Sequence, residues 1–581
     1  MALSAEDIRT RRQQRLTDEV GGVSKTWQDQ LKIALIYPNH YYHAMSNLGF
    51  QAVYHSIQQR EDCLCERFFV PDRDELDYFS RSPLLSFETQ HALQDFDVVL
   101  FSLSFENDYL NLPLIAEMTR TSLWRQQRED AEPLWIAGGI CAMLNPEPVA
   151  EIMDVFAVGE AEVLLEPMIE TLLDHHERDA TLDALVRLPG FYVPDYYQPH
   201  YQADGTRNRV DVRQPAAQRV ERRWLADLND SDCQSFIQTE HTAFGTMHLH
   251  EVSRGCSRGC RFCATGFTYL PPREKDADIL CAQILPDLSA QQTAGLVGAA
   301  VSDYSHLKQV SAAIQSQGGQ VSVASLRIDS LTREDVAALR DGGQKTLALA
   351  PEAGSQRMRD LINKHLSEKQ IFDAVALLAE EGILNLKLYF LIGLPDEQSE
   401  DIDDFIALIK TIRHVWVEGQ KPFGRLGTIT ISVNPFIPKP ATPFQWCPMD
   451  TLASLKKKVA LLRKAINRLA NVQLQVESLR GAELQALLAV GDRQVGRMLP
   501  LLAEGSNLKA ACRAMNVDLQ QLVHTPREQG TLLPWEVINT GVEKDYLWND
   551  YQRALLGKLT PPCHRACTRC GVCRTVKEEH S

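Results

Sequence analysis

The chain has 581 residues, with 60 lysine and arginine against 76 aspartate and glutamate side chains, and so a formal net charge of −16 at pH 7. An acidic chain is not expected to coat DNA or RNA, which requires a basic surface. It has no run of about 18 apolar residues that would span a membrane, and residues 1–20 lack the apolar core of a secretory signal. Composition therefore predicts a cytoplasmic globular protein of about three or four domains.

The first 175 residues have the pattern of a parallel sheet behind a charged tail. Residues 1–30 are polar and charged, and we expect a helical or loose tail there. Strands alternating with helices predict a doubly wound, Rossmann-like domain over 31–175. Residues 176–240 are polar and interrupted by prolines, which indicates a linking segment. The candidate strands of the domain lie at 32–38, 97–105, 133–139 and 154–162, with a helix expected at 46–60.

The alternation of strands and helices repeats over residues 241–450. Ser367 and Gln370 form a capping-box pattern at the start of one helix, and Thr332 begins another. Because six strand–helix units are fewer than the eight of a closed barrel, we expect a (β/α)6 partial barrel that is open on one side. The overall fold class is thus α/β. The six candidate strands lie at 247–253, 294–301, 321–326, 346–350, 386–392 and 428–434.

The last part of the chain divides into a helical segment and a small tail. Over 451–530, apolar residues recur every three or four positions, and basic residues at 456–468 lie on the opposite face. We expect this basic face to be an ordinary solvated helix face, with RNA contact as the alternative. Residues 531–581 form a small cysteine-rich tail.

Seven of the fourteen cysteines are scattered and seven form two clusters. In a reducing compartment such thiols are expected as metal ligands or buried small residues. The first cluster, Cys256, Cys260 and Cys263, has the spacing C-x3-C-x2-C directly after the first predicted barrel strand. Three thiolates are one short of the set that holds a cubane iron–sulfur cluster, which leaves one iron open to another ligand. A structural zinc site completed by His248 or His250 is the alternative.

The second cluster lies in the tail and comprises Cys563, Cys567, Cys570 and Cys573. Four thiolates are a complete ligand set for a [4Fe-4S] cluster and equally for a structural zinc ion. We expect an auxiliary [4Fe-4S] cluster there, with zinc as the alternative. His564 is expected to be a neighbour of this site rather than a ligand.

The segment around the first cluster resembles the radical S-adenosylmethionine (SAM) superfamily, with Phe262 in the aromatic position of the cysteine loop. The barrel segments 325–329, 351–355, 392–395 and 434–443 agree with this resemblance. It implies a SAM-binding [4Fe-4S] cluster on the three loop cysteines. The family's Gly-Gly-Glu segment after the second strand is absent, and we expect backbone carbonyls, Ser302 or Asp303 in its place. The SAM contacts that the resemblance implies are Phe262, Ser302, Ser325, Arg327, Glu352, Ile392 and Gly393.

Residues 32–170 resemble the cobalamin-binding-like domain that precedes the barrel in many radical SAM proteins. The motif that supplies a cobalt-ligating histidine, D-x-H-x-x-G, is missing. A bound cobalamin would therefore lack that lower ligand, and a domain that has lost the cofactor or binds something else is equally open. Over 31–575 the chain resembles one uncharacterised bacterial radical SAM family. The cobalamin contacts implied by the matching positions are Ser46, Ser102, Gly138, Gly139, Gly159 and Glu160.

The resemblance implies a radical SAM enzyme that cleaves SAM reductively to a 5′-deoxyadenosyl radical and modifies an unactivated position. With cobalamin bound, the expected reaction is methyl transfer to carbon. The alternatives are methylthiotransferase-like sulfur insertion on RNA or protein, a non-catalytic iron–sulfur electron carrier, and a zinc-stapled binding module. The expected partners are a reductant such as flavodoxin or ferredoxin, and a substrate that is a small molecule, an RNA or a protein. No catalytic residue is assigned; Asp303, Lys364 and Tyr389 are more readily explained as surface or packing residues.

Overall fold

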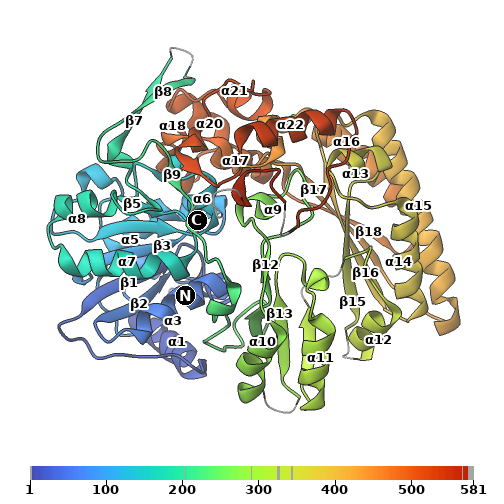
Figure 1. The fold of residues 1–581 in the computed structure, drawn as a ribbon, viewed down its shortest axis with the longest axis horizontal. Helices are drawn as coiled ribbons and strands as arrows, with labels where there is room; N and C mark the ends of the chain where they lie inside the picture. The colour runs from blue at the N-terminus through green and yellow to red at the C-terminus, as the bar shows by residue number, and fades with distance from the viewer. Residues whose placement is uncertain are drawn as a thin grey trace. The chain divides into compact units, whose positions relative to one another are not determined.

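The structure, a computed structural model, divides the chain into two compact units, and each is described by itself (Figure 1). The first unit combines Met1–His250 with two later segments, Leu488–Leu519 and Thr531–Thr540. The second unit combines Glu251–Leu487 with Gln520–Gly530 and Gly541–Ser581. The described residues are 3–202, 205–288, 291–323, 327–341, 344–564 and 567–573.

A six-stranded sheet forms the centre of the first unit, in the order β2-β1-β3-β4-β5-β6; Figure 1 labels β1, β2, β3 and β5 of this sheet. Neighbouring strands are parallel except β6, which pairs antiparallel with β5. This is the order of a doubly wound fold, in which ligands bind beyond the carboxyl ends of the strands where the order reverses, here between β1 and β3. The Rossmann-like prediction is confirmed. The strands are β1 Leu31–Tyr37, β2 Cys63–Phe69, β3 Val98–Ser102, β4 Leu134–Gly138, β5 Val155–Ala157 and β6 Phe191–Tyr192.

The helix that the sequence predicted at 46–60 is present as α3. Asn47 caps α3, where its side chain accepts a hydrogen bond from the N–H of Phe50, and the helix buries Phe50, Tyr54 and Ile57. Two short ladders accompany the sheet, β7 (Tyr197–Tyr201) with β8 (Arg207–Val212) and β9 (Val220–Glu221) with β19 (Ile538–Asn539). The helices are α1 Ala5–Asp18, α2 Tyr41–Met45, α3 Leu48–Gln59, α4 Leu76–Phe79, α5 Asn111–Thr119, α6 Ile140–Leu144, α7 Ala161–Asp174, α8 Arg178–Leu185, α18 Arg493–Gly496, α19 Leu499–Ala503 and α20 Leu508–Ala514.

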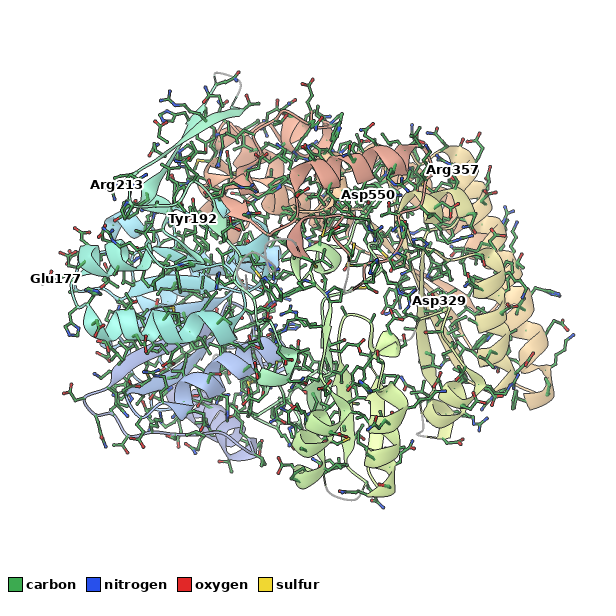
Figure 2. All side chains as sticks on the ribbon, viewed as in Figure 1. Glu177, Tyr192, Arg213, Asp329, Arg357 and Asp550 are labelled. Atoms are coloured by element: carbon green, nitrogen blue, oxygen red, sulfur yellow. The ribbon has the colours of Figure 1, made fainter. Side chains whose placement is uncertain are left out.

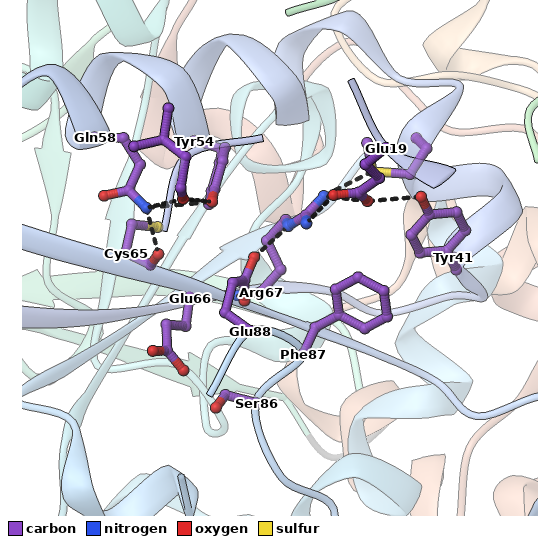
Figure 3. Close-up of polar contacts among 12 residues, drawn as sticks. Glu19, Tyr41, Tyr54, Gln58, Cys65, Glu66, Arg67, Ser86, Phe87 and Glu88 are labelled. Carbon is purple, nitrogen blue, oxygen red and sulfur yellow. Dashed lines mark hydrogen bonds and ion pairs between the residues drawn. The ribbon is translucent and has the colours of Figure 1, made fainter. Parts of the chain in front are cut away.

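Strand β2 carries two charged side chains and was not predicted, because Glu66 and Arg67 interrupt its apolar pattern. Both are buried. The Arg67 guanidinium lies between two carboxylates, with Nη2 2.7 Å from Glu19 and Nε 2.6 Å from Glu88 (Figure 3). Glu19 directly follows α1, which a Ser4 capping box opens. Of residues 1–30, Ala5–Asp18 are helical and 19–30 are not, and the Glu19–Arg67 ion pair joins the end of the helix to the sheet.

The later segments of the chain complete the first unit at a buried ionic centre around Glu147. Its carboxylate accepts hydrogen bonds from Arg207, from the hydroxyl of Tyr192 and, at 3.3 Å, from Nε of Arg493 in α18. Burial by itself raises the pKa of Glu147, but Arg493 and Arg207 outweigh it and lower that pKa to about 2. Glu147 is therefore ionised inside the unit and depends on both arginines.

Each of the six predicted barrel strands is present: five lie in the second unit, and the first, β10, spans the unit boundary. The described residues form a three-stranded sheet, β10-β13-β14, and a four-stranded parallel sheet, β15-β16-β17-β18. Strand β18 was not predicted, since its residues alternate with glutamine inside a segment expected to be helical. The α/β partial-barrel fold class is confirmed. The strands are β10 His248–Glu251, β13 Thr293–Val297, β14 Gln320–Val323, β15 Thr346–Glu352, β16 Asn385–Ile392, β17 Ile429–Pro435 and β18 Val472–Val476, with a small ladder of β11 Ser253–Arg254 and β12 Arg273–Glu274.

The helices of the second unit bear out the capping and periodicity arguments. The Ser367–Gln370 capping box opens α14, and α16 buries the predicted apolar face. On the basic face of α16, Lys458 does not extend into solvent: its Nζ lies 2.7 Å from Glu397 and 2.8 Å from Asp450. The helices are α9 Thr265–Thr268, α10 Ala277–Ile284, α11 Leu307–Ser316, α12 Arg333–Asp341, α13 Gln356–Leu361, α14 Glu368–Glu380, α15 Ser399–Gln420, α16 Leu452–Ile466 and α22 Lys544–Leu555, while α17 Leu479–Val490 and α21 Leu519–His524 span the unit boundary.

A search of the helices within the described ranges finds none that combines the length and the apolar character needed to cross a membrane.

Candidate active site

The three loop cysteines lie on a short loop, residues 255–263, that is closed at its base by the β11–β12 ladder. Gly255 has φ +83°, and a Cβ added there would lie 2.4 Å from the carbonyl oxygen of Tyr269. Only glycine fits this position, because the chain must turn with positive φ while another backbone segment passes close by. Gly259 also has a positive φ, of +68°. The two glycines thus let the cysteine loop turn tightly.

The thiols of the cysteine loop lie close enough to influence one another. Burial raises the pKa of Cys260 to about 12; Lys364 opposes this, and Cys263, Cys256 and Glu352 add to it. Burial likewise raises the pKa of Cys263. A bound metal centre holds such thiols as thiolates, because its positive charge replaces the missing solvation. The donor set therefore fits an iron–sulfur cluster held by three cysteines.

A cluster of four charged side chains lies directly beside the cysteine loop. Arg258, between Cys256 and Cys260, donates two hydrogen bonds to Asp303, of 2.6 and 2.8 Å. Arg327 donates at 2.8 and 2.9 Å to Asp329, and its Nε lies 3.4 Å from Asp303. Asp303 and Asp329 follow β13 and β14, so the carboxyl ends of these strands and the cysteine loop converge here.

The predicted SAM residues Ser302 and Arg327 meet in this charge cluster. The hydroxyl of Ser302 accepts a hydrogen bond of 3.2 Å from the backbone N–H of Arg327. Asp303, expected as a substitute for the missing family glutamate, is part of the same cluster. Ser325 lies outside the described residues.

Glu352 and Lys364 form a second polar pair beside the thiols. The carboxylate of Glu352 accepts from Nζ of Lys364 at 3.3 Å. Glu352 ends β15 with φ +67° and is deeply placed, so that burial raises its pKa against the effect of Lys364. Both residues also influence the pKa of Cys260. Lys364, which the sequence left as an ordinary surface residue, therefore lies at the site.

The remaining predicted SAM residues have clear structural roles. Phe262 packs against a buried apolar cluster that includes Met358, Leu361 and Phe436. Ile392 is buried at the end of β16, and Gly393 follows it with φ +72°. The contact of Phe262, Ile392 and Gly393 with SAM stays a prediction.

The tail cysteines, Cys563, Cys567, Cys570 and Cys573, also lie close together. Burial raises the pKa of Cys563 to about 12, and the three other thiols add to this rise. Burial acts the same way on Cys567, but Arg569, whose Nε lies 3.2 Å from its Sγ, outweighs it and lowers that pKa. The described residues include no group of three or more His, Cys, Asp or Glu side chains arranged around a single metal-ion position. Iron–sulfur and zinc binding at either cysteine set therefore stay predictions.

In the first unit, four of the predicted cobalamin residues lie at the switch point of the sheet or at the end of the next strand, β4. Ser102 ends β3 and pairs with Gly138 at the end of β4. Ser46 follows β1, and its neighbour Asn47 donates a hydrogen bond of 3.1 Å to Ser104, two residues after β3. A Cβ on Gly139 would lie 2.6 Å from the carbonyl oxygen of Leu103. These loops meet at the edge where doubly wound folds bind ligands.

The other two predicted cobalamin residues contact the chain itself. A Cβ on Gly159 would lie 2.2 Å from the carbonyl oxygen of Arg223. The carboxylate of Glu160 accepts from the N–H of Leu225 at 3.0 Å and lies 3.8 Å from Arg222. The chain's own segment 222–225 thus explains why Gly159 is glycine and why Glu160 is charged, and a cobalamin contact from them stays a prediction.

Sequence reasoning missed Arg258 and Arg261, although both stand inside the cysteine loop, and also Asn363. The signal in the sequence was weak: arginines inside a metal-binding loop are usually explained by solvent exposure. Figure 2 labels Asp329, in the turn after β14, and Asp550, on α22, which are acidic partners of Arg258 and Arg261.

Two family models match the chain. The model for radical SAM proteins, N-terminal, matches residues 49–194, which include the central sheet of the first unit from α3 onward. The model for the radical SAM superfamily matches residues 250–409, which include the cysteine loop, the charge cluster, Glu352 and Gly393.

Relatives in sequence and in structure are distant. The chain is 28% identical over 484 residues to the uncharacterized protein MJ0966 of Methanocaldococcus jannaschii, a match that covers 83% of this chain and 93% of that protein. It is 25% identical over 169 residues to the uncharacterized methyltransferase PH0819 of Pyrococcus horikoshii, covering 28% of this chain and 36% of that protein. A solved structure of the cobalamin-dependent SAM radical enzyme OxsB, with aqua-cobalamin and SAM bound, matches at 13% identity and a TM-score of 0.43. That match covers 84% of this chain, which spans only 62% of the OxsB chain.

The family models and the geometry point to the same residues. The superfamily model covers the strand ends at which the three loop cysteines meet Arg258, Asp303 and Arg327. The N-terminal model covers most of the Rossmann-like domain that precedes the barrel in the chain. The chain belongs to the radical SAM superfamily.

Proposed function

We propose that this radical SAM enzyme holds its cluster on the cysteine loop and modifies an unactivated position of its substrate. The observation that carries the proposal is the convergence of three thiols with the charge cluster at the carboxyl ends of β13, β14 and β15. Three thiolates leave one iron of a [4Fe-4S] cluster without a protein ligand. When bound, the cluster supplies one electron to SAM, whose sulfonium C–S bond then breaks to give methionine and a 5′-deoxyadenosyl radical.

The side chains around the loop suit the two ends of an amino acid such as the methionine part of SAM. The Asp303 carboxylate, shared between Arg258 and Arg327, has the charge to accept from an ammonium group. The planar guanidinium of Arg327 matches a carboxylate with two parallel donors. Ser302 fixes the backbone at Arg327 through its 3.2 Å hydrogen bond. The half-buried Glu352–Lys364 pair adds one charge of each sign beside the thiols.

The test is anaerobic reconstitution with iron and sulfide, followed by addition of SAM and dithionite. We expect about four irons on the loop set and release of 5′-deoxyadenosine. Cys256→Ala should abolish the loop iron and the release of 5′-deoxyadenosine. Cys281→Ala, which changes a cysteine outside the loop set and the tail set, should leave the iron content and the release unchanged. Loaded wild-type protein that releases no 5′-deoxyadenosine would contradict the proposal.

A second measurement separates the role of the charged side chains from that of the cysteines that would bind iron. Asp303→Asn should leave the iron content of the reconstituted protein unchanged and raise the KM for SAM about tenfold, the cost of weakening one charged hydrogen bond. Lys369→Gln changes an exposed charge of the same unit and should leave both values unchanged. Equal KM values for the wild type and Asp303→Asn would remove Asp303 from SAM binding.

For the reaction itself, the function that we propose is cobalamin-dependent methyl transfer to carbon. Two observations support it: the switch point of the first unit, where Ser46, Ser102 and Gly138 lie, and the similarity of 169 residues to a protein named as a methyltransferase. Protein produced with cobalamin should retain about one cobalt per chain, the content of a single corrin site. Gly138→Val should lower the cobalt content, because the added side chain would occupy space proposed for cobalamin. The fold itself has room for a Cβ at this position, which would lie 4.0 Å from the carbonyl oxygen of Ala157. Gly530→Val, at an open position, is the control, and wild-type protein without cobalt would contradict methyl transfer by this route.

We also propose that a low-potential one-electron donor such as flavodoxin or ferredoxin reduces the enzyme, and that the tail cysteines hold a second [4Fe-4S] cluster. The complete set of four thiolates, all on one segment, supports the second cluster. Iron analysis of the Cys256→Ala variant tests it, because about four irons should remain on the tail in that variant. Zinc in their place would contradict it.

A further inference from the structure

Arg261, inside the cysteine loop, is tied to the C-terminal part of the chain. It occupies the position between Cys260 and Phe262, and its side chain is 0% exposed. Nε and Nη2 each lie 3.1 Å from a different carboxylate oxygen of Asp550 in α22, and Nη2 also donates at 2.6 Å to the carbonyl of Lys558. Burying a guanidinium is costly unless it is paired and its donors are satisfied. The loop therefore contains a buried charge that pairs with a carboxylate of the C-terminal segment.

A second set of hydrogen bonds joins the same two segments. The buried side chain of Asn363 donates to the carbonyl of Gly259 at 3.0 Å and to that of Thr560 at 3.1 Å. Its own Oδ1 accepts from the N–H of Thr560 at 2.8 Å. The side-chain amide of Asn363 thus bonds to the backbone of the cysteine loop through its nitrogen, and to the backbone of the tail through both its nitrogen and its oxygen.

These bonds bring the first tail cysteine to the cysteine loop itself. The N–H of Cys563 donates a hydrogen bond of 2.6 Å to the carbonyl of Ser257, the neighbour of Cys256. Such a bond keeps two Cα atoms within about 7 Å, and consecutive Cα atoms are about 3.8 Å apart, so the Cα atoms of Cys563 and Cys256 lie within about 11 Å. Within the tail, Arg569 donates hydrogen bonds of 2.8 and 2.7 Å to the carbonyls of Pro561 and Pro562, the residues just before Cys563.

We infer that Arg261, Asp550, Asn363 and Thr560 form a lock that positions the tail cysteines beside the loop cysteines, so that the two iron–sulfur clusters are immediate neighbours. This rests on the proposed function, which places a [4Fe-4S] cluster at each set. The lock residues are positioning residues: none needs to touch iron or SAM. Two clusters so placed interact magnetically when both are reduced, whereas clusters held on independent segments do not.

The test is low-temperature EPR of the reconstituted full chain, reduced with dithionite, together with iron and zinc analysis. The wild type should contain about eight irons, as two cubanes require. Its spectrum should be broadened, and it should saturate at several-fold higher microwave power than the summed spectra of two reference variants. One reference, Cys256→Ala, lacks the loop cluster, and the other, Cys567→Ala, lacks the tail cluster.

Variants of the lock then test the positioning. Asp550→Asn leaves Arg261 without its counter-charge and should give spectra close to the sum of the two references. The double variant Arg261→Met with Asp550→Leu removes both charges at similar volume, which usually preserves folding, and should narrow the spectrum in the same way. Asp545→Asn, an exposed carboxylate on the same helix, should retain the broadened wild-type spectrum.

The outcomes separate this inference from the proposed function. A wild-type spectrum equal to the sum of the references, zinc in the tail, or a broadened spectrum that survives in both lock variants would overturn the inference. Failure of the proposed function looks different: the Cys567→Ala variant would then carry no iron on the loop and release no 5′-deoxyadenosine.

Discussion

The buried carboxylate of Glu147 allows a quantitative prediction about the first unit. Its pKa lies at about 2, against an ordinary value of 4.5, because Arg493 and Arg207 outweigh the effect of burial. A shift of this size corresponds to about 3 kcal/mol of stability at neutral pH, at about 1.4 kcal/mol for each pKa unit. We therefore expect Glu147→Gln to lower the free energy of unfolding by about 3 kcal/mol at pH 7, which is also the range for breaking a buried ion pair.

The pH dependence of this loss has a definite sign. A carboxyl group whose pKa is lower in the folded than in the unfolded protein stabilises the fold above its unfolded pKa, and that stability disappears as the pH falls through its folded pKa. The difference between wild type and Glu147→Gln should therefore be full above pH 5 and shrink to less than half by about pH 3. Urea unfolding followed by tryptophan fluorescence at several pH values measures it.

The matched control is the neighbouring ion pair between Glu151 and Arg497, which is largely exposed, with side chains 25% and 56% accessible. Glu151→Gln should cost less than about 1 kcal/mol, as exposed pairs usually do. Equal losses for the two variants at pH 7, or a loss from Glu147→Gln that does not change with pH, would refute the assignment of Glu147 as a buried, ionised centre.

Three further predictions concern the second unit. Gly255→Ala should abolish iron binding on the cysteine loop while leaving iron on the tail, because the added Cβ would lie 2.4 Å from a carbonyl oxygen; loop iron that persists would contradict this. Lys458→Met should cost about 3 kcal/mol in urea unfolding because it leaves two carboxylates unpaired, whereas Lys457→Met on the exposed face should cost less than about 0.5 kcal/mol. Cys447, buried and with its pKa raised to about 12 by that burial, should resist iodoacetamide in the native protein at pH 8, and mass spectrometry should find the half-exposed Cys281 alkylated first.

The sequence predicted those parts of the fold in which local pattern and tertiary structure agree. Four strands of the first unit were visible as short apolar runs, which is typical of parallel strands buried on both faces. The barrel strands were visible from apolar residues that recur along each segment, and in β16 and β17 buried residues alternate with half-buried ones. Strand β2 was missed because Glu66 and Arg67 are charged and buried at once, and their partners Glu19 and Glu88 lie elsewhere in the chain. Pairing over such distances leaves no periodic signal.

The same distinction between local pattern and long-range pairing applies to the candidate site. The loop cysteines were found because a spacing of three and two residues is a local property. The lock around Arg261 was not, since its partners Asp550 and Thr560 follow it by 289 and 299 residues. Lys364 was similarly placed at the site only by its contact with Glu352. Local motifs were thus sufficient to find the candidate cysteine ligands, whereas the residues that position them were found only from the fold.

The interrupted course of the chain through the first unit has a consequence for biosynthesis. Arg493 follows Glu147 by 346 residues, which takes roughly 20 to 70 s to translate at about 5–20 residues per second. During that interval the nascent domain has its carboxylate matched by Arg207 alone, although its sheet is already complete. The N-terminal domain is therefore complete only when the last fifth of the polypeptide has left the ribosome. A chain terminated before Arg493 would contain a buried carboxylate that lacks one of its two arginines.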